Sequence, residues 1–256
     1  MHATLSEIGC TVQGANLAAP TATDVQALRQ LLYAHRVILL KGAALDVIQF
    51  GAFAMAFANP VACAPASRHP LNAVVSITGD AEGEAGRRWR SDNSYLRVPR
   101  AITMLMPTNV SGRVRGSTLF VDMSEVFAAL GADLQVHLEA ATFLHKGEGG
   151  SARHPALITH PHTHERILFA NRAYTVSMDV AGVEQPASAL AQILDFAERP
   201  PFVKELAWSA GDLVIWDNRF LQHRPGRRAR GAAALRIFAS DAYPLCASQY
   251  TAMHAA

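Results

Sequence analysis

Between residues 74 and 239 the chain carries a series of short apolar runs bounded by turn residues, the pattern of β-strands. The runs are Val74–Ile77, Ala101–Met106, Ser117–Val121, Ala156–Thr159, Ile167–Ala170, Leu213–Trp216 and Leu235–Ala239, and two earlier ones lie at Cys10–Gly14 and Val37–Leu40. Helical patterns precede the series at 23–32 and 45–57 and interrupt it at 123–130 and 187–196. Helices that feed many short strands predict an α+β protein built on a β-sandwich or barrel. Such folds commonly bind ligands in the mouth of the barrel.

Composition narrows the classes of partner. The 256 residues include 23 Lys+Arg and 21 Asp+Glu, a net charge of +2, which excludes a protein that coats nucleic acid. Half of the residues are hydrophobic, enough for a sizeable core. Only 17% are charged, against about 25% in typical soluble proteins, which predicts a large interior or an interface between copies in a homo-oligomer. Without repeats, linkers or a shift in composition, we expect one domain over residues 1–256.

The cysteines and the apolar stretches predict the compartment. Cys10, Cys63 and Cys246 are far apart, odd in number and in no metal-binding spacing, which favours a reducing, cytoplasmic setting. The longest apolar stretch, 43–58, is interrupted by polar residues and too short to span a bilayer, and Met1 opens no signal-peptide pattern. We therefore expect no membrane association.

Two segments place polar residues beside aromatic ones. They are Arg87–Tyr95 (RRWRSDNSY) and Gly211–His223 (GDLVIWDNRFLQH). Polar groups that are buried among aromatic rings cost free energy unless they find partners, so these segments are the candidate sites. From the residues alone, Asp92 and His223 could equally be any buried acid and any core histidine.

Four landmarks follow one another along the chain. They are Trp89–Tyr95, GSTLFVDM from Gly116, THP from Thr159 followed by LFAN from Leu168, and WDNRFLQH from Trp216. On these landmarks the chain resembles the TauD/TfdA family of Fe(II)/2-oxoglutarate dioxygenases, most closely the 2,4-dichlorophenoxyacetate dioxygenase type. The resemblance implies a double-stranded β-helix, or jelly roll, with flanking helices. It also implies an oxidoreductase that uses Fe(II) and 2-oxoglutarate on a small-molecule, possibly anionic, substrate.

The family holds iron with a facial triad of two histidines and one carboxylate. In this sequence Asp92 matches the carboxylate and His223 the distal histidine, whereas the remaining ligand position is Arg90. An arginine stays protonated and has no lone pair to donate to a metal. If residues 89–92 are extended, Arg90 and Asp92 point to one face and form an ion pair. We expect Arg90, Asp92 and His223 to form the centre of the site, with Asp92 and His223 as an incomplete set of metal ligands.

The resemblance also suggests ligand contacts. Thr118 matches a threonine that contacts 2-oxoglutarate. Arg236 is either the arginine that anchors the co-substrate or its neighbour, in which case Ala232 stands at the anchor position; both registers turn Arg236 into the barrel. Asn93, Tyr95 and Asn72 are candidate substrate-binding residues.

Three readings stay open at this point. In the first reading, the protein oxidises a small substrate with iron held by two protein ligands. Alternatively it is a non-oxidative enzyme of isomerase, lyase or cyclase type, in which His223 serves as acid or base and Arg90 or Arg236 holds an anion. In the third reading it is a catalytically silent binding protein that reuses the pocket.

Overall fold

A nine-stranded sheet forms the frame of the protein. The computed structural model describes residues 1–62, 68–78, 87–108, 115–228, 233–241 and 246–247. In spatial order the sheet comprises β1 (His2–Leu5), β2 (Cys10–Gln13), β3 (Val37–Leu40), β16 (Leu213–Asp217), β7 (Ile102–Pro107), β18 (Ala234–Ser240), β6 (Asn72–Thr78) and β5 (Arg68–His69), with β4 (Asn59–Pro60) paired to β18. All of its pairings are antiparallel except that of β2 with β3.

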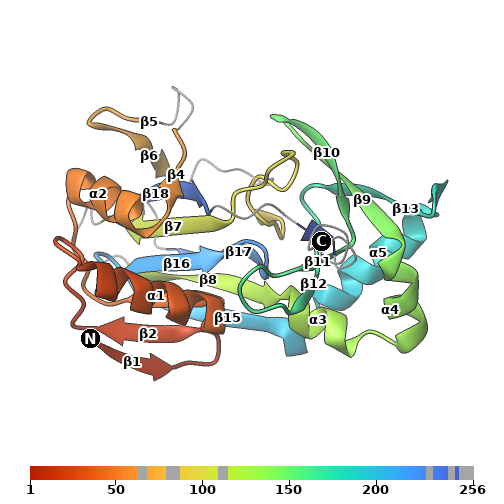
Figure 1. Ribbon diagram of the computed structural model, residues 1–256, viewed down its shortest axis with the longest axis horizontal. Coiled ribbons are helices and arrows are strands. Elements are labelled where there is room, and N and C mark those ends of the chain that lie inside the picture. Colours follow the sequence, from red (N-terminus) through yellow and green to blue (C-terminus); the bar gives the residue numbers. More distant parts are fainter. Residues whose placement is uncertain (63–67, 79–86, 109–114, 229–232, 242–245, 248–256) are drawn as a thin grey trace, which may run out of the picture.

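Three smaller sheets complete the β structure. They are β15 (Val203–Ser209), β8 (Arg115–Asp122) and β17 (Leu221–Arg228); β10 (Gly150–Pro155), β9 (Ala141–Gly147), β13 (Thr175–Val180) and β14 (Val183–Glu184); and β12 (Arg166–Leu168), β11 (Leu157–Thr159) and β19 (Cys246–Ala247). The β9, β10 and β13 group extends away from the end of the molecule at which the second helix lies (Figure 1). This architecture confirms the expected jelly roll with flanking helices.

Alternate residues of the large sheet enter two separate cores, because successive side chains in a strand point to opposite faces. Val37 and Leu39 face the β15–β8–β17 sheet, whose Phe120 and Trp208 belong to the same cluster. Ile38 and Leu40 enter a second cluster, which packs under the first two helices. Because both faces are covered, these central strands are continuously apolar.

Within the described residues, four helices lie close to the predicted bounds, whereas the helix over 132–139 was not predicted. The helices are α1 (Ala22–His35), α2 (Val47–Phe57), α3 (Met123–Ala129), α4 (Ala132–Glu139) and α5 (Ala187–Ala197), followed by the 3-10 turn η4 (Pro200–Phe202). Capping boxes start α1 at Thr21 and α2 at Asp46, so α2 begins two residues after the predicted Leu45. Both helices cover one face of the large sheet, where α2 buries Phe50 and Phe53 (Figure 1).

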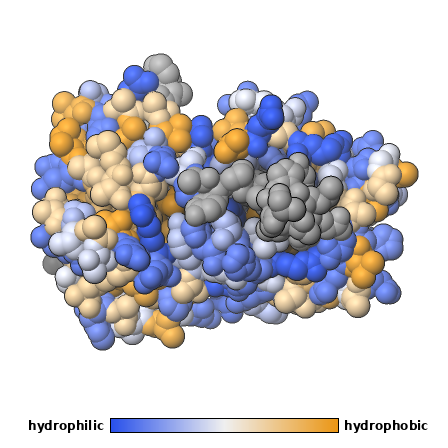
Figure 2. All heavy atoms as spheres, viewed as in Figure 1, coloured by the Kyte–Doolittle hydropathy of each residue, from blue (hydrophilic) through white to orange (hydrophobic). Residues whose placement is uncertain are grey.

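The helices and the exposed apolar side chains can be set against the predicted lack of membrane association and the predicted homo-oligomer. Within the residues described here, no helix is long and apolar enough to cross a membrane. Helix α2 exposes Ile48 and Met55, and the space-filling view carries apolar atoms at this end of the molecule (Figure 2). The homo-oligomer and the single domain stay predictions.

Candidate functional site

Arg90, Asp92 and His223 lie together, as the sequence predicted. Nε of Arg90 is 3.6 Å from Oδ1 of Asp92, and Nε2 of His223 is 3.5 Å from Oδ2 of the same carboxylate. The three residues are 8%, 5% and 4% exposed, so the charges interact in a medium of low dielectric constant. An isolated bridge between the main chains of Arg90 and His223 connects β17 to the loop that carries Asp92.

A chain of two hydrogen bonds, through Thr103 and Asn218, holds the Asp92 carboxylate. The Thr103 hydroxyl donates to Oδ2 of Asp92 at 2.8 Å, and Nδ2 of Asn218 donates to the Thr103 hydroxyl at 2.8 Å. Burial by itself raises the pKa of Asp92, but the positive charges of His223, Arg90 and Arg236 and the Thr103 hydrogen bond outweigh it and hold the pKa below its usual range. Asp92 is therefore a carboxylate at neutral pH.

The loop after Asp92 is fixed by buried side chains from distant segments. Ser94 Oγ accepts a hydrogen bond from Nδ2 of Asn171 at 2.9 Å and lies 3.0 Å from Nδ1 of His145. His154 Nε2 contacts the carbonyl oxygens of Ser94 and Leu96, at 2.9 and 3.0 Å. These contacts tie the loop to β9 and β10, so the position of Asp92 is set by the sheet and not by the loop alone.

A pocket of about 410 Å³ opens beside this loop. The residues that line it are Arg88, Arg90, Asp92, Asn93, Tyr95, Lys146, Gly147, Glu148, Ala173, Tyr174, Arg236 and Phe238. Four cationic side chains and two carboxylates leave a net formal charge of +2. Burial and the Asp92 charge, opposed by Arg90, raise the pKa of Tyr174 to about 12, so its phenol remains a hydrogen-bond donor. The lining suits a small anion with an apolar or aromatic part.

The pocket gathers some of the expected ligand contacts and leaves others elsewhere. Arg236 lines it, on the same face of β18 as Phe238, and its guanidinium lies 4.7 Å from the centre of that ring. Thr118 lies on β8, where its hydroxyl accepts a hydrogen bond from the Trp208 indole at 3.1 Å. Asn72 caps the start of β6, with Oδ1 accepting from the Val74 amide at 3.1 Å. Thr118, Asn72 and His223 are not among the described residues that line the pocket, and the alternative anchor, position 232, lies outside the described residues.

Sequence reasoning did not single out seven of the described residues that line the pocket, although one of them lies within the candidate segment 87–95. They are Arg88, Lys146, Gly147, Glu148, Ala173, Tyr174 and Phe238. Phe238 was within reach, because it is two residues after Arg236 on a strand and so shares its face. Tyr174 follows the LFAN landmark, and its loop is joined to the site by a hydrogen bond from the Ala173 amide to the Trp89 carbonyl, at 2.9 Å. Lys146 and Glu148 belong to a hairpin whose position depends on tertiary contacts, and the sequence holds no local signal for them.

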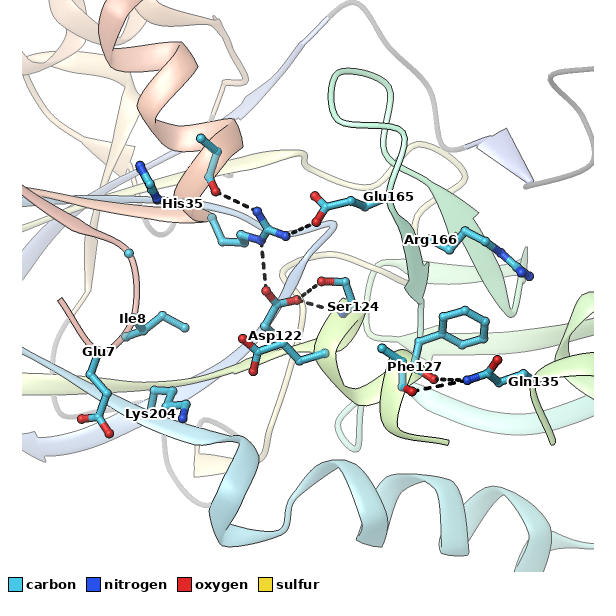
Figure 3. A pocket seen from close by; sticks show the side chains of 15 residues that line it. Glu7, Ile8, His35, Asp122, Ser124, Phe127, Gln135, Glu165, Arg166 and Lys204 are labelled. Atoms are coloured by element: carbon cyan, nitrogen blue, oxygen red, sulfur yellow. Dashed lines mark hydrogen bonds and ion pairs between the residues drawn. The ribbon is translucent and has the colours of Figure 1, made fainter. Parts of the chain in front are cut away.

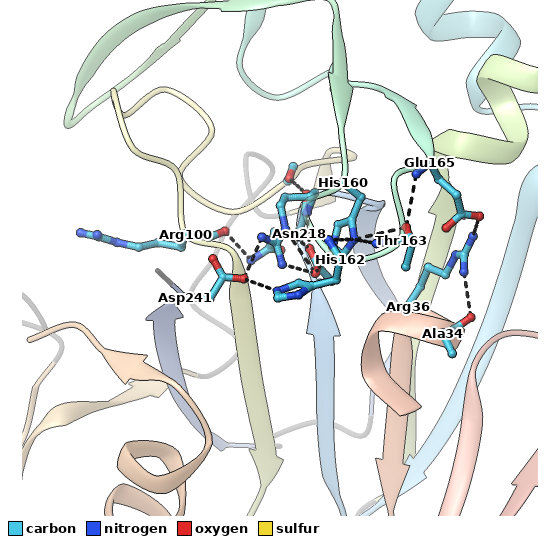
Figure 4. Close-up of polar contacts among 12 residues, drawn as sticks. Ala34, Arg36, Arg100, His160, His162, Thr163, Glu165, Asn218 and Asp241 are labelled. Atoms are coloured by element: carbon cyan, nitrogen blue, oxygen red, sulfur yellow. Dashed lines mark hydrogen bonds and ion pairs between the residues drawn. The ribbon is translucent and has the colours of Figure 1, made fainter. Parts of the chain in front are cut away.

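A second buried network anchors the strand that leads to His223 (Figure 4). Nε2 of His160 is 3.0 Å from Oδ2 of Asp217, and both side chains are fully buried. Arg219 bridges Asp217 and Asp241, at 2.6 and 2.7 Å. Burial opposes ionisation of Asp217, but Arg219 and His160 outweigh it and lower its pKa. Because each charge has a partner, this network serves the structure of the segment 217–223.

A larger hollow of about 770 Å³ lies on another part of the surface (Figure 3). Arg36 joins its two sides through Asp122, at 3.0 Å, and through a close ion pair with Glu165. Arg166 pairs with Glu139 in the same way and lies over the Phe127 ring. The described lining holds four carboxylates and three cationic side chains from Lys and Arg, so these charges nearly balance and give little preference for a ligand of one charge.

The candidate site offers few side chains that could bind a metal ion. In the described ranges, no group of three or more His, Cys, Asp or Glu side chains is arranged to hold a metal ion. At the candidate site, Asp92 and His223 are the two groups that could donate to one, and the third side chain at the centre, Arg90, is a cation.

The profile of the family described as taurine catabolism dioxygenase TauD, TfdA family matches residues 3–232. An alpha-ketoglutarate-dependent 2,4-dichlorophenoxyacetate dioxygenase of Cupriavidus pinatubonensis is 30% identical over 164 residues, which are 56% of this chain and 55% of that protein. An (S)-phenoxypropionate/alpha-ketoglutarate-dioxygenase of Delftia acidovorans is 26% identical over 85% of this chain and 86% of its own length. The chain thus spans about half the length of the first relative and most of the second.

A solved structure shares the fold. A taurine dioxygenase from Burkholderia xenovorans superposes with a TM-score of 0.80 at 21% identity, over 93% of this chain and 88% of that one.

Proposed function

The chain belongs to the taurine catabolism dioxygenase TauD, TfdA family, and from this premise we propose that it binds a small carboxylate in the family's pocket without holding Fe(II). The relatives named above are alpha-ketoglutarate-dependent dioxygenases, which makes an oxidoreductase the starting expectation. The observation that carries a different conclusion is the guanidinium of Arg90, 3.6 Å from the carboxylate that would bind the metal.

Arg90 cannot serve as a metal ligand, and its position also opposes a metal. Its main chain is fixed by hydrogen bonds to His223, and its side chain is 90% buried beside Asp92. A divalent cation between Asp92 and His223 would lie beside this fixed positive charge, a repulsion on the order of several kcal/mol in a partly buried site. With two protein ligands in place of three, the site has little to offset that cost. The donor set does not fit Fe(II).

With Arg90 at the position of a metal-ligand histidine, the cavity is suited to binding an anion. Because Arg90 neutralises Asp92, the remaining cations Arg88, Arg236 and Lys146 give the cavity its positive charge. Charge-assisted hydrogen bonds to a carboxylate are stronger than neutral ones, and arginine matches a carboxylate in shape. The phenols of Tyr95 and Tyr174 add polar contacts on an aromatic wall.

Binding is favoured over non-oxidative catalysis by the placement of His223. A general base must reach the proton that it removes, but His223 is 4% exposed and is absent from the described lining of the pocket. Asp92 lines the pocket, yet its pKa is held low, which makes it a weak base. Among the described residues that line the pocket, four cationic side chains and two phenols can bind and orient an anion, which favours binding over acid–base catalysis.

Equilibrium measurements test the proposal. We expect chelator-treated protein to bind 2-oxoglutarate in isothermal titration calorimetry and to take up less than stoichiometric Mn(II) in equilibrium dialysis. Arg90→His completes the ligand set and should gain Mn(II) binding, whereas Arg88→His adds the same imidazole two residues earlier and should not. Stoichiometric Mn(II) or Fe(II) binding by the parent protein, or no carboxylate binding without metal, would overturn the proposal.

A further inference from the structure

We propose that the tip of the β9–β10 hairpin, residues 146–149, makes this pocket selective for dianions, with Lys146 contacting the second carboxylate of the ligand. The inference rests on the proposed carboxylate binding and names its substrate class. The tip is part of the cavity, because Lys146, Gly147 and Glu148 all line it.

Two glycines allow the tip to lie directly on the Tyr95 ring. A Cβ atom at Gly147 would come within 2.3 Å of Cδ1 of Tyr95, and one at Gly149 within 2.8 Å of Cε2. Such distances are far below van der Waals contact, so any larger residue would force the tip off the ring. The glycines therefore set the height of the tip above the pocket.

The ring under the tip is itself held in place. Nδ2 of Asn93 donates to the Tyr95 hydroxyl at 2.9 Å, and Tyr95 meets the Tyr174 ring edge to face, with the ring centres 4.9 Å apart. The Lys146 amide donates to the Tyr174 carbonyl at 2.8 Å. The hairpin, Tyr95 and Tyr174 thus form one connected wall, and Lys146 is carried by it.

The cations of the pocket come from separate elements. Arg236 lies on β18 of the large sheet and is supported by the Phe238 ring, while Lys146 is the second-last residue of β9 in the four-stranded sheet. Arg90 is engaged by Asp92. Arg88 adds a third cation to the lining. With one carboxylate of the ligand at Arg236 or Arg88, we place a second carboxylate against Lys146. Glu148, on the same tip, supplies charge of the opposite sign and opposes any further negative charge.

A matched pair of probes separates this inference from the proposed function. 2-Oxoglutarate carries two carboxylates, and 2-oxopentanoate lacks the distal one but keeps the chain length. We expect Lys146→Met to weaken binding of 2-oxoglutarate about tenfold and to leave binding of 2-oxopentanoate within about twofold, by calorimetry at constant ionic strength. Glu148→Gln should act in the opposite direction on the dianion, and Lys204→Met, on β15, should leave both affinities unchanged.

The outcomes are distinct. If the parent binds 2-oxoglutarate and Lys146→Met weakens both probes equally or neither, the selectivity inference is wrong and carboxylate binding stands. If the parent binds neither probe, both proposals are overturned.

The glycine contacts give an independent test. Gly147→Ala should reduce the preference for 2-oxoglutarate over 2-oxopentanoate, because the new Cβ lifts the tip away from Tyr95. Gly131→Ala is the control, since a Cβ there meets nothing within 4 Å. Adding Tyr95→Ala to Gly147→Ala should restore part of the preference. An unchanged preference in Gly147→Ala with normal folding would contradict the role given to the tip.

Discussion

The main chains of Arg90 and His223 exchange two hydrogen bonds, 3.0 Å from the Arg90 amide to the His223 carbonyl and 2.8 Å in the other direction. The bridge joins the segment that carries Asp92 to the strand that carries His223 and fixes the backbone of both. Since the guanidinium extends from a fixed Cα toward Asp92, the positive charge at the centre of this site is part of the chain. A charge held in this way is retained in chelator, unlike a metal ion.

Removing that charge should destabilise the fold through Asp92. We expect Arg90→Met to lower the free energy of unfolding by about 3 kcal/mol, because it takes away a buried partner of a buried carboxylate. Asp92→Asn in the Arg90→Met background should recover much of the loss, since no charge then remains to be paired. Urea unfolding at pH 7 of the parent, both single variants and the double variant measures the coupling. Strictly additive effects would show that the two side chains do not interact.

Thr103 should matter through its hydroxyl. Thr103→Val keeps the shape but removes the hydrogen bond to Asp92 and the acceptor for Asn218, which we expect to cost about 1–3 kcal/mol of unfolding free energy. Thr103→Ser keeps the hydroxyl and serves as the matched control in the same urea titration. If the serine variant is as unstable as the valine variant, the lost methyl contact is the cause and the hydrogen-bond chain is not.

The fold was largely readable because its central strands are apolar on both faces. Runs such as Val37–Leu40 and Leu213–Trp216 enter two cores at once, and this burial leaves a clear signal. Strand β17 gave no such signal, since its sequence LQHRPGRR contains proline, glycine and three arginines. Its pairing with β8, between two neighbours, is what makes it a strand.

Site residues could be predicted from the sequence where they belong to a motif. They could not be predicted where tertiary contacts determine the position of the side chain. The ion pair of Arg90 with Asp92 followed from their spacing. The direction of Thr118 did not, because the indole of Trp208 on the adjacent strand takes up its hydroxyl. Lys146 lines the pocket from a hairpin whose two glycines lie against Tyr95, a tertiary contact with no local signal in the sequence.

The buried network around Asp217 should be far more sensitive than a surface ion pair. We expect Asp217→Asn to lower the unfolding free energy by about 3–5 kcal/mol, since Arg219 would lose its closest carboxylate in a buried position. Asp195→Asn is the control: Asp195 pairs with Arg172 at 2.6 Å, but its side chain is 70% exposed, so the change should stay within about 1 kcal/mol. Similar losses in the two variants, by urea unfolding, would refute the structural role of the network.

His145 should make stability depend on pH. Burial and the nearby His154 lower the pKa of His145 from 6.5 to about 3 in the folded protein, and a backbone hydrogen bond opposes this shift only in part. The unfolded chain therefore takes up a proton below about pH 6.5 that the folded chain refuses, so the unfolding free energy falls as the pH drops from 6.5 toward 3. The slope from this one group reaches about 1.4 kcal/mol per pH unit.

His145→Gln removes this titration and should flatten the pH dependence by about 2 kcal/mol between pH 7 and pH 5. His137→Gln, on the exposed side of α4, should keep the slope of the parent protein. The difference between the urea-unfolding curves therefore measures His145 together with its interaction with His154. Parallel curves for the parent and His145→Gln would mean that His145 is protonated equally in the folded and unfolded states, and the buried neutral imidazole beside Ser94 would have to be abandoned.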